Sequence, residues 1–127
     1  MVLMSRSLAV LSGLVLGSSL ILSAPAGAQQ SDFFKGKTVS VYIGFAPGGG
    51  YDYYGRLVAR YIGKHIPGNP KVIVQNMPGA GSLTAINHMA NLAPKDGTAI
   101  ATFARGTPFE PLMGNKQAQF DPRNLTW

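Results

Sequence analysis

The chain has 127 residues, with 11 basic and 5 acidic side chains that give a net charge of +6, and it contains no cysteine. The absence of cysteine excludes disulfide bonds and a lipid-modified N-terminal cysteine. The basic residues occur singly and never as a Lys/Arg run, so a nucleic-acid partner is not expected, whereas the positive charge suits small anions.

The first 28 residues have the three-part layout of a secretory signal peptide. Arg6 is their only charged residue, residues 8–22 form an uncharged apolar run, and Ala26-Gly27-Ala28 supplies a small-residue cleavage pattern. The alternative is a membrane anchor, but the apolar run is shorter than the roughly 20 residues that a spanning helix needs. Cleavage after Ala28 and export to the periplasm are therefore expected.

Strand and helix signals then alternate along the chain. Residues 38–45 (TVSVYIGF) predict a strand that is buried on both faces. A Pro-Gly-Gly-Gly loop follows, and Asp52 is expected to cap a helix that runs to about His65. Five apolar residues recur at helical spacing and predict the face of this helix that packs on the core: Tyr54, Leu57, Val58, Tyr61 and Ile62.

The same pattern is repeated once. Residues 71–75 predict a second strand, residues 76–81 a second glycine loop, and residues 82–92 a second helix. A Pro-Lys-Asp-Gly turn leads to a third strand over residues 98–104. Strands that alternate with helices at this spacing predict βαβ units with a parallel sheet, so the expected fold class is α/β.

Both glycine loops should lie side by side at the carboxyl edge of the sheet, where open α/β sheets bind ligands. Each loop leads into a helix N-terminus, whose free N–H groups and dipole favour an anion, and glycine lets the backbone approach it. Residues 45–52 and 76–85 contain no Lys or Arg, so main-chain N–H groups and hydroxyls such as Ser82 and Thr84 would hold a carboxylate. Plain tight turns are the alternative, and it is weaker for two adjacent loops than for one.

A nucleotide is a poorer match to these loops. The Gly-x-x-x-x-Gly-Lys phosphate loop is absent, and residues 79–84 fit the dinucleotide fingerprint only in part because Thr84 replaces its last small residue. The acidic partner of that fingerprint should end the following strand, whereas Asp96 precedes it.

The sequence offers no catalytic or metal-binding constellation. His65 and His88 lack neighbouring metal ligands, and Glu110 has no second carboxylate near it for acid–base catalysis. Ser82 lacks the Gly-x-Ser-x-Gly setting of a nucleophile. No catalytic residue, metal or cofactor is therefore predicted, and the protein is not expected to be an enzyme.

Three motifs together resemble a known family. Residues 45–52 (FAPGGGYD), 74–81 (VQNMPGAG) and 94–98 (PKDGT) are similar to the N-terminal signatures of Bug-type extracytoplasmic receptors, the substrate-binding proteins of tripartite tricarboxylate transporters. The resemblance covers residues 32–127. It implies a type II-like periplasmic binding protein with two α/β domains and a small organic carboxylate pinched between the two glycine loops, partly through water. Ser82 stands where the family often has glycine, which alters that contact.

The resemblance also sets the expected domain organisation and partners. Residues 29–127 would be the N-terminal part of the first solute-binding domain, a βαβαβ unit, with the second domain absent from this fragment. Residues 125–127 begin an apolar run that stops at once, which also favours a fragment of a longer protein. The expected partners are a small organic carboxylate (a di- or tricarboxylate or an aromatic acid) and the permease subunits of the transporter, and the receptor is expected to be a monomer.

The expected ligand contacts come from both loops and from the end of the third strand. Tyr51 is placed ahead of the first helix and should line the cleft. Arg105 is placed for a bidentate pair with a second carboxylate, with a solvated surface arginine as the alternative. The full set of predicted ligand-binding residues is Phe45, Gly48, Gly49, Gly50, Tyr51, Asp52, Asn76, Pro78, Gly79, Ala80, Gly81, Ser82 and Arg105.

Two rival functions remain open beside the transport receptor. A carboxylate-sensing receptor for a signalling system would have the same cleft. A secreted α/β enzyme could use the glycine loops as an oxyanion site, but the missing nucleophile and acid–base pair disfavour it.

Overall fold

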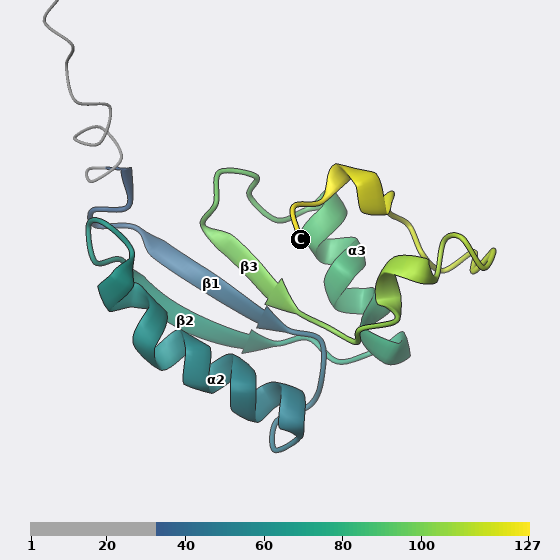
Figure 1. Ribbon diagram of the computed structural model, residues 1–127, viewed down its shortest axis with the longest axis horizontal. Helices are drawn as coiled ribbons and strands as arrows, with labels where there is room; N and C mark the ends of the chain where they lie inside the picture. The colour runs from purple at the N-terminus through teal and green to yellow at the C-terminus, as the bar shows by residue number, and fades with distance from the viewer. Residues whose placement is uncertain (1–32) are drawn as a thin grey trace, which may run out of the picture.

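The structure is a computed structural model that describes residues 33–127 (Figure 1). The expected signal peptide, residues 1–28, lies outside the described residues. Three strands form one parallel sheet in the order β2-β1-β3, which confirms the α/β class and the parallel pairing. The strands are β1 (Thr38–Ile43), β2 (Lys71–Asn76) and β3 (Ala99–Thr102).

Two helices connect these strands, and they cover opposite faces of the sheet. Helix α2 (Gly50–Ile62) connects β1 to β2, and α3 (Leu83–Asn91) connects β2 to β3. A Cβ atom at Gly55 of α2 would meet the Ile43 side chain, whereas the ring of Tyr42 lies 4.8 Å from that of His88 in α3. Successive side chains of a strand point to opposite faces, so α2 and α3 lie on the two sides of β1.

The order of the strands creates a place for a ligand. Strand β1 lies between β2 and β3. The first connection leads from β1 to β2 on one side of it, and the second connection leads from β2 past β1 to β3 on its other side. The carboxyl ends of β1 and β3 therefore flank a topological switch point, where open α/β sheets bind ligands. Central β1 is buried on both faces, as predicted, and holds much of the core: Val39, Val41, Tyr42 and Ile43.

The start of α2 differs from the prediction. The helix begins at Gly50 with Gly49 as its N-cap, so Asp52 is not the cap and Tyr51 lies within the first turn. Regular α-helix ends at Ile62, and a 3-10 turn continues it to His65. The run of three glycines has no side chain to compete with the first helical hydrogen bonds, which allows the earlier start.

The predicted core face of α2 is wrong. Tyr54 is 67% exposed and Val58 is 50% exposed, whereas the buried residues of this helix are Asp52 and Gly55. A Cβ atom at Gly55 would lie 2.7 Å from Cδ1 of Ile43, so only glycine permits this close approach to the sheet. The helix therefore packs on β1 through Gly55, while Tyr54 and Val58 stay exposed beside the sheet, where they line a hollow with Val41 and Ile100.

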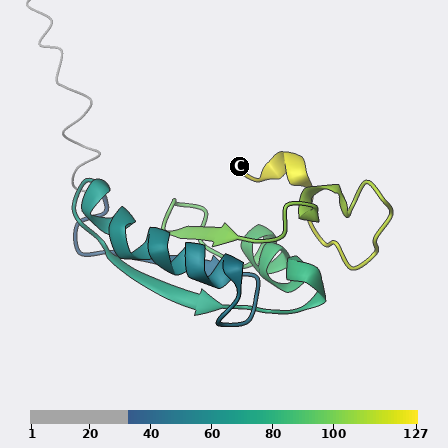
Figure 2. The same ribbon diagram turned by 60° about the horizontal axis from the view of Figure 1, so that its bottom comes forward.

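The remaining elements are short. The second helix was predicted over residues 82–92, but a 3-10 turn at Ala80–Ser82 precedes α3. Another 3-10 turn, Pro122–Asn124, lies near the C-terminus, and Trp127 is edge-on to Phe103 with ring centroids 5.6 Å apart. Figure 2 shows this C-terminal segment beside the sheet.

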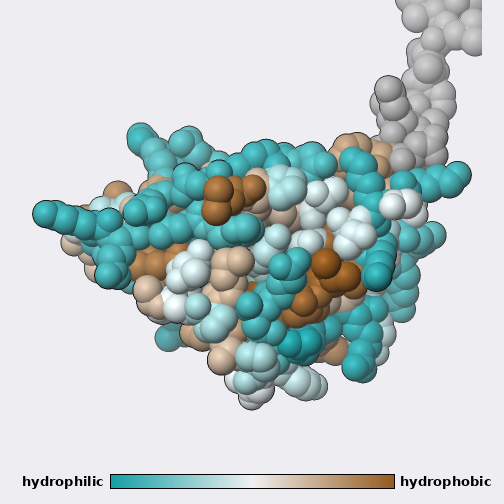
Figure 3. Space-filling view, turned by 180° about the vertical axis from the view of Figure 1, so that it is seen from behind, coloured by the Kyte–Doolittle hydropathy of each residue, from teal (hydrophilic) through white to brown (hydrophobic). Residues whose placement is uncertain are grey.

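Neither helix within residues 33–127 is long and apolar enough to cross a membrane. The face seen from behind carries its apolar side chains in separate patches between hydrophilic ones (Figure 3).

Candidate functional site

Three loops meet at the carboxyl edge of the sheet: loop 1 (residues 44–49, after β1), loop 2 (residues 77–82, after β2) and loop 3 (residues 103–106, after β3). Ser82 connects them. Its Oγ donates a hydrogen bond to the Gly44 carbonyl at 3.2 Å and accepts one from the Ala104 N–H at 3.1 Å. The two glycine loops thus lie side by side, as expected.

The Ser82 side chain is turned inward. It is 1% exposed, and a Cβ atom at Gly44 would lie 2.7 Å from its Cβ. Its φ of 82° lies in the left-handed region, which is costly for any residue with a side chain. The Ser82 hydroxyl, which was predicted to bind a ligand, therefore hydrogen-bonds the main chain of loops 1 and 3. Its role is to hold these loops together.

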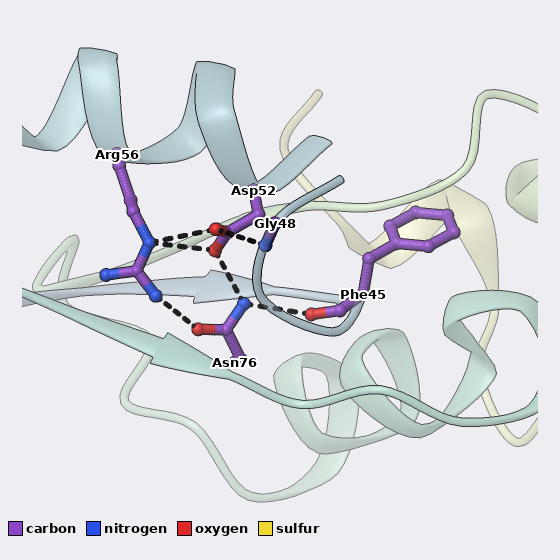
Figure 4. Close-up of polar contacts among 5 residues, drawn as sticks. All are labelled: Phe45, Gly48, Asp52, Arg56 and Asn76. Carbon is purple, nitrogen blue, oxygen red and sulfur yellow. Dashed lines mark hydrogen bonds and ion pairs between the residues drawn. The ribbon is translucent and has the colours of Figure 1, made fainter. Parts of the chain in front are cut away.

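Asp52 is the centre of a polar network that ties loop 1 to the end of β2 (Figure 4). Its carboxylate accepts hydrogen bonds from the Gly48 N–H at 2.9 Å, from Nδ2 of Asn76 at 2.7 Å, and from Nε of Arg56 at 2.9 and 3.0 Å. Nη2 of Arg56 also donates to Oδ1 of Asn76 at 2.6 Å, and Nδ2 of Asn76 donates to the Phe45 carbonyl at 2.9 Å. We call the five residues of this network the loop clamp: Phe45, Gly48, Asp52, Arg56 and Asn76.

The loop clamp keeps the Asp52 carboxylate ionised. Hydrogen bonds from Arg56, from Asn76 and from the Gly48 N–H outweigh the effect of burial and lower the pKa of Asp52 from 3.8 to about 2. The negative charge is compensated by Arg56, and the acceptor positions are used within the chain. Asp52 therefore orders loop 1 and presents no free negative charge to a ligand.

Arg56 is the residue that sequence reasoning missed. Loops 1 and 2 contain no cation, but Arg56 lies one helical turn beyond Asp52, and an acid–base pair at i, i+4 on a helix was the available signal. Arg56 and Arg60 line a hollow of about 290 Å³ beside Gly48. The surroundings of loop 1 are thus more cationic than its own sequence indicates.

The N-terminus of α2 offers main-chain donors to an anion. Its N-cap, Gly49, makes no side-chain cap, and the first N–H groups of a helix have no intrahelical partners. A Cβ atom at Gly49 or Gly50 would meet no other atom within 4 Å, so the space in front of these residues is open. A carboxylate could approach this backbone closely and lie in the positive field of the helix dipole.

Loop 2 is not equivalent to loop 1. The N–H groups of Ser82 and Thr84 donate to the Gly79 carbonyl at 3.0 and 3.5 Å, so the amides that lead into α3 are partly engaged. The backbone from Gly79 to Ser82 has positive φ at four consecutive residues and forms a compact turn. Of the two expected anion-binding loops, loop 1 has the more open donors.

Two aromatic rings and an arginine complete the edge. The rings of Phe45 and Tyr51 are stacked, with centroids 4.3 Å apart and an interplanar angle of 8°. The Tyr51 hydroxyl accepts a hydrogen bond from the Arg105 N–H at 3.4 Å. Arg105 is therefore near loop 1, as placed from the sequence, and its guanidinium has no hydrogen-bond or ion-pair partner among residues 33–127.

The other candidates stand apart from this edge. The His88 ring packs against Tyr42, and its Nε2 is buried without a hydrogen-bond partner in the described part of the chain. Glu110 accepts a hydrogen bond from Nδ2 of Asn115 at 2.8 Å. Within residues 33–127, no group of three or more His, Asp or Glu side chains is arranged to hold a metal ion.

Comparison with known proteins finds one relative by sequence, while no protein-family model matches the chain. The "UPF0065 protein in gbd 5'region" of Cupriavidus necator is 37% identical over 105 residues. The match covers 83% of this chain and 31% of the relative, so the chain spans about a third of that protein's length. UPF0065 is the family of Bug-type tripartite tricarboxylate receptors, so this relative fits the resemblance of the loop motifs.

Proposed function

We propose that the protein is a solute-binding receptor that captures a small organic carboxylate in the periplasm for a tripartite tricarboxylate-type transporter. The observation that carries this proposal is the open, uncapped N-terminus of α2, which the loop clamp fixes at the switch point of the sheet. The similarity to a UPF0065 protein supports the same class of receptor.

The carboxylate would be held mainly by main-chain N–H groups of Gly49, Gly50 and Tyr51. These donors belong to a helix start that is ordered before a ligand arrives, and such preorganisation reduces the cost of binding. Asp52 and Arg56 neutralise each other within the loop clamp, so the ligand does not compete with a free carboxylate.

The wider architecture belongs to the same proposal. Residues 1–28 would be a cleaved signal peptide, and residues 29–127 the start of the first domain of a type II-like periplasmic binding protein. A second domain would close over the ligand, and the closed form would be recognised by the permease subunits. The receptor would act as a monomer without a cofactor.

The test uses the full-length protein purified from the periplasm. Mass spectrometry of small molecules that copurify should identify an organic acid, and calorimetry should show that the acid rebinds to the emptied receptor. Gly49→Val should weaken binding strongly, because its side chain would fill the approach to the α2 donors while meeting no atom of the described chain at its Cβ.

Leu112→Val provides the control, since Leu112 is 77% exposed and lies outside the three loops of the site. Equal affinity of the wild type and Gly49→Val for the copurified acid would refute the proposed site. Failure of every mono-, di- and tricarboxylate in a panel to bind the wild type would refute the proposed function.

A further inference from the structure

The stacked rings of Phe45 and Tyr51 occupy a specific place at the carboxyl edge. Phe45 belongs to loop 1, and Tyr51 follows the two open glycines, Gly49 and Gly50, in the first turn of α2. The hydrogen bond from the Arg105 N–H to the Tyr51 hydroxyl places this ring between α2 and loop 3, across the ends of β1 and β3. The rings therefore lie at the switch point itself.

The pair is not part of the hydrophobic core. In a parallel stack each ring covers one face of the other, yet Tyr51 remains 37% exposed, so part of its surface is open. Phe45 contributes only its carbonyl to the loop clamp, because its ring is directed away from Arg56 and Asp52 (Figure 4). A half-exposed aromatic stack beside unpaired main-chain donors has the composition of a binding-site wall.

We infer that Phe45 and Tyr51 form an aromatic wall of the carboxylate site that selects planar aromatic acids over aliphatic acids of the same size and charge. This inference rests on the proposed function and names the substrate class of its site. The carboxylate group of an aromatic acid lies in the plane of its ring. A ligand whose carboxylate faces the α2 donors can therefore extend its ring along Tyr51, and offset stacking favours it over a puckered aliphatic ring.

The inference also assigns separate roles to the parts of Tyr51. The ring supplies the wall, and the hydroxyl connects it to loop 3 through the Arg105 N–H. Phe45 is stacked on one face of the Tyr51 ring. Loss of the hydroxyl alone should therefore leave the preference for aromatic acids, whereas loss of the ring should remove it.

The experiment compares benzoate with cyclohexanecarboxylate, which have the same charge and ring size, by calorimetry on the emptied full-length protein. The wild type should bind benzoate more tightly by roughly 2- to 12-fold, the range of an aromatic pair. Tyr51→Leu should bind both acids equally, and Tyr51→Phe should keep the preference. Tyr53→Leu is the matched control, because Tyr53 lies two residues further on α2, is 65% exposed and contacts Tyr54 instead of Phe45.

Each outcome has a defined meaning. Equal binding of the two acids by the wild type, or an unchanged preference in Tyr51→Leu, would overturn the aromatic wall while leaving the carboxylate receptor intact. Loss of the preference in Tyr53→Leu as well would overturn the assignment to Tyr51. Binding of neither acid, nor of any other carboxylate in the panel, would overturn the proposed function together with this inference.

Discussion

Both carboxylate oxygens of Asp52 face Nε of Arg56, at 2.9 and 3.0 Å, one turn along the same helix. The side chain of Arg56 is 48% exposed, whereas that of Asp52 is 7% exposed, so a solvated cation covers a nearly buried anion. The pair would add little as an isolated surface contact. Its importance comes from Asn76 and Gly48, which extend it from α2 to both loop 1 and the end of β2.

The loop clamp predicts the behaviour of the protein in acid. The pKa of Asp52 is lowered to about 2 in the folded protein, so its contribution to stability is complete above about pH 4 and is lost as the pH falls towards 2. Arg56→Leu removes the largest cause of the lowered pKa, so the pKa of Asp52 should rise. The acid-unfolding midpoint, followed by circular dichroism, should therefore move to a higher pH.

Arg60→Leu is the control for that measurement. It removes the same charge one turn further along α2, from the same hollow, but Arg60 is not part of the loop clamp. Identical acid-unfolding midpoints for the two variants would show that overall charge, and not the clamp, sets the acid stability.

Substitutions of Ser82 should lower the stability of the protein in a specific order, with alanine lowering it more than glycine. Ser82→Ala leaves the Gly44 carbonyl and the Ala104 N–H without their buried partner, and the free energy of unfolding should fall by roughly 1–3 kcal/mol. Ser82→Gly loses the same hydrogen bonds but removes the cost of a side chain at a φ of 82°, so it should be about 1 kcal/mol more stable than the alanine variant. Urea denaturation measures both, and an alanine variant as stable as the glycine variant would contradict this account.

The sequence predicts local structure here better than it predicts contacts across the sheet. The alternation of strands, glycine loops and helices identified the parallel sheet and its carboxyl edge, because each of these signals depends on neighbouring residues. The inward turn of Ser82 could not be predicted, since its partners, Gly44 and Ala104, are 38 and 22 residues away. The exposure of Tyr54 and Val58 was missed for a similar reason: helical spacing defines an apolar stripe but does not say whether the sheet covers it.

The close approach of α2 to the sheet depends on the lack of a side chain at Gly55. A Cβ atom at this position would lie 2.7 Å from Cδ1 of Ile43 and 3.2 Å from Cγ2 of Thr102. Gly55→Ala should therefore lower the free energy of unfolding by ~1–3 kcal/mol through overpacking, although alanine is the better helix former. Adding Ile43→Val, which removes Cδ1, should recover part of the loss. A stabilised Gly55→Ala variant in thermal denaturation would show that α2 can move away from β1 without cost.

We expect Arg105 to distinguish acids with two carboxylates from acids with one. It follows β3, its N–H lies against the Tyr51 hydroxyl, and its guanidinium has no partner among residues 33–127, so it is available to a second carboxylate of a ligand held at α2. Arg105→Gln should weaken a diacid such as terephthalate by roughly 1.5–3 kcal/mol, the range for a hydrogen bond to a charged group. Benzoate should lose much less, because its single carboxylate would stay on the α2 donors. Arg60→Gln removes an equal charge away from the Phe45–Tyr51 wall and should affect both acids alike. Calorimetry with the two acids against the wild type and both variants measures these affinities. Equal losses of affinity for terephthalate and benzoate in Arg105→Gln would mean that this arginine acts through the general electrostatic field of the protein. It would then not be a partner for the second carboxylate.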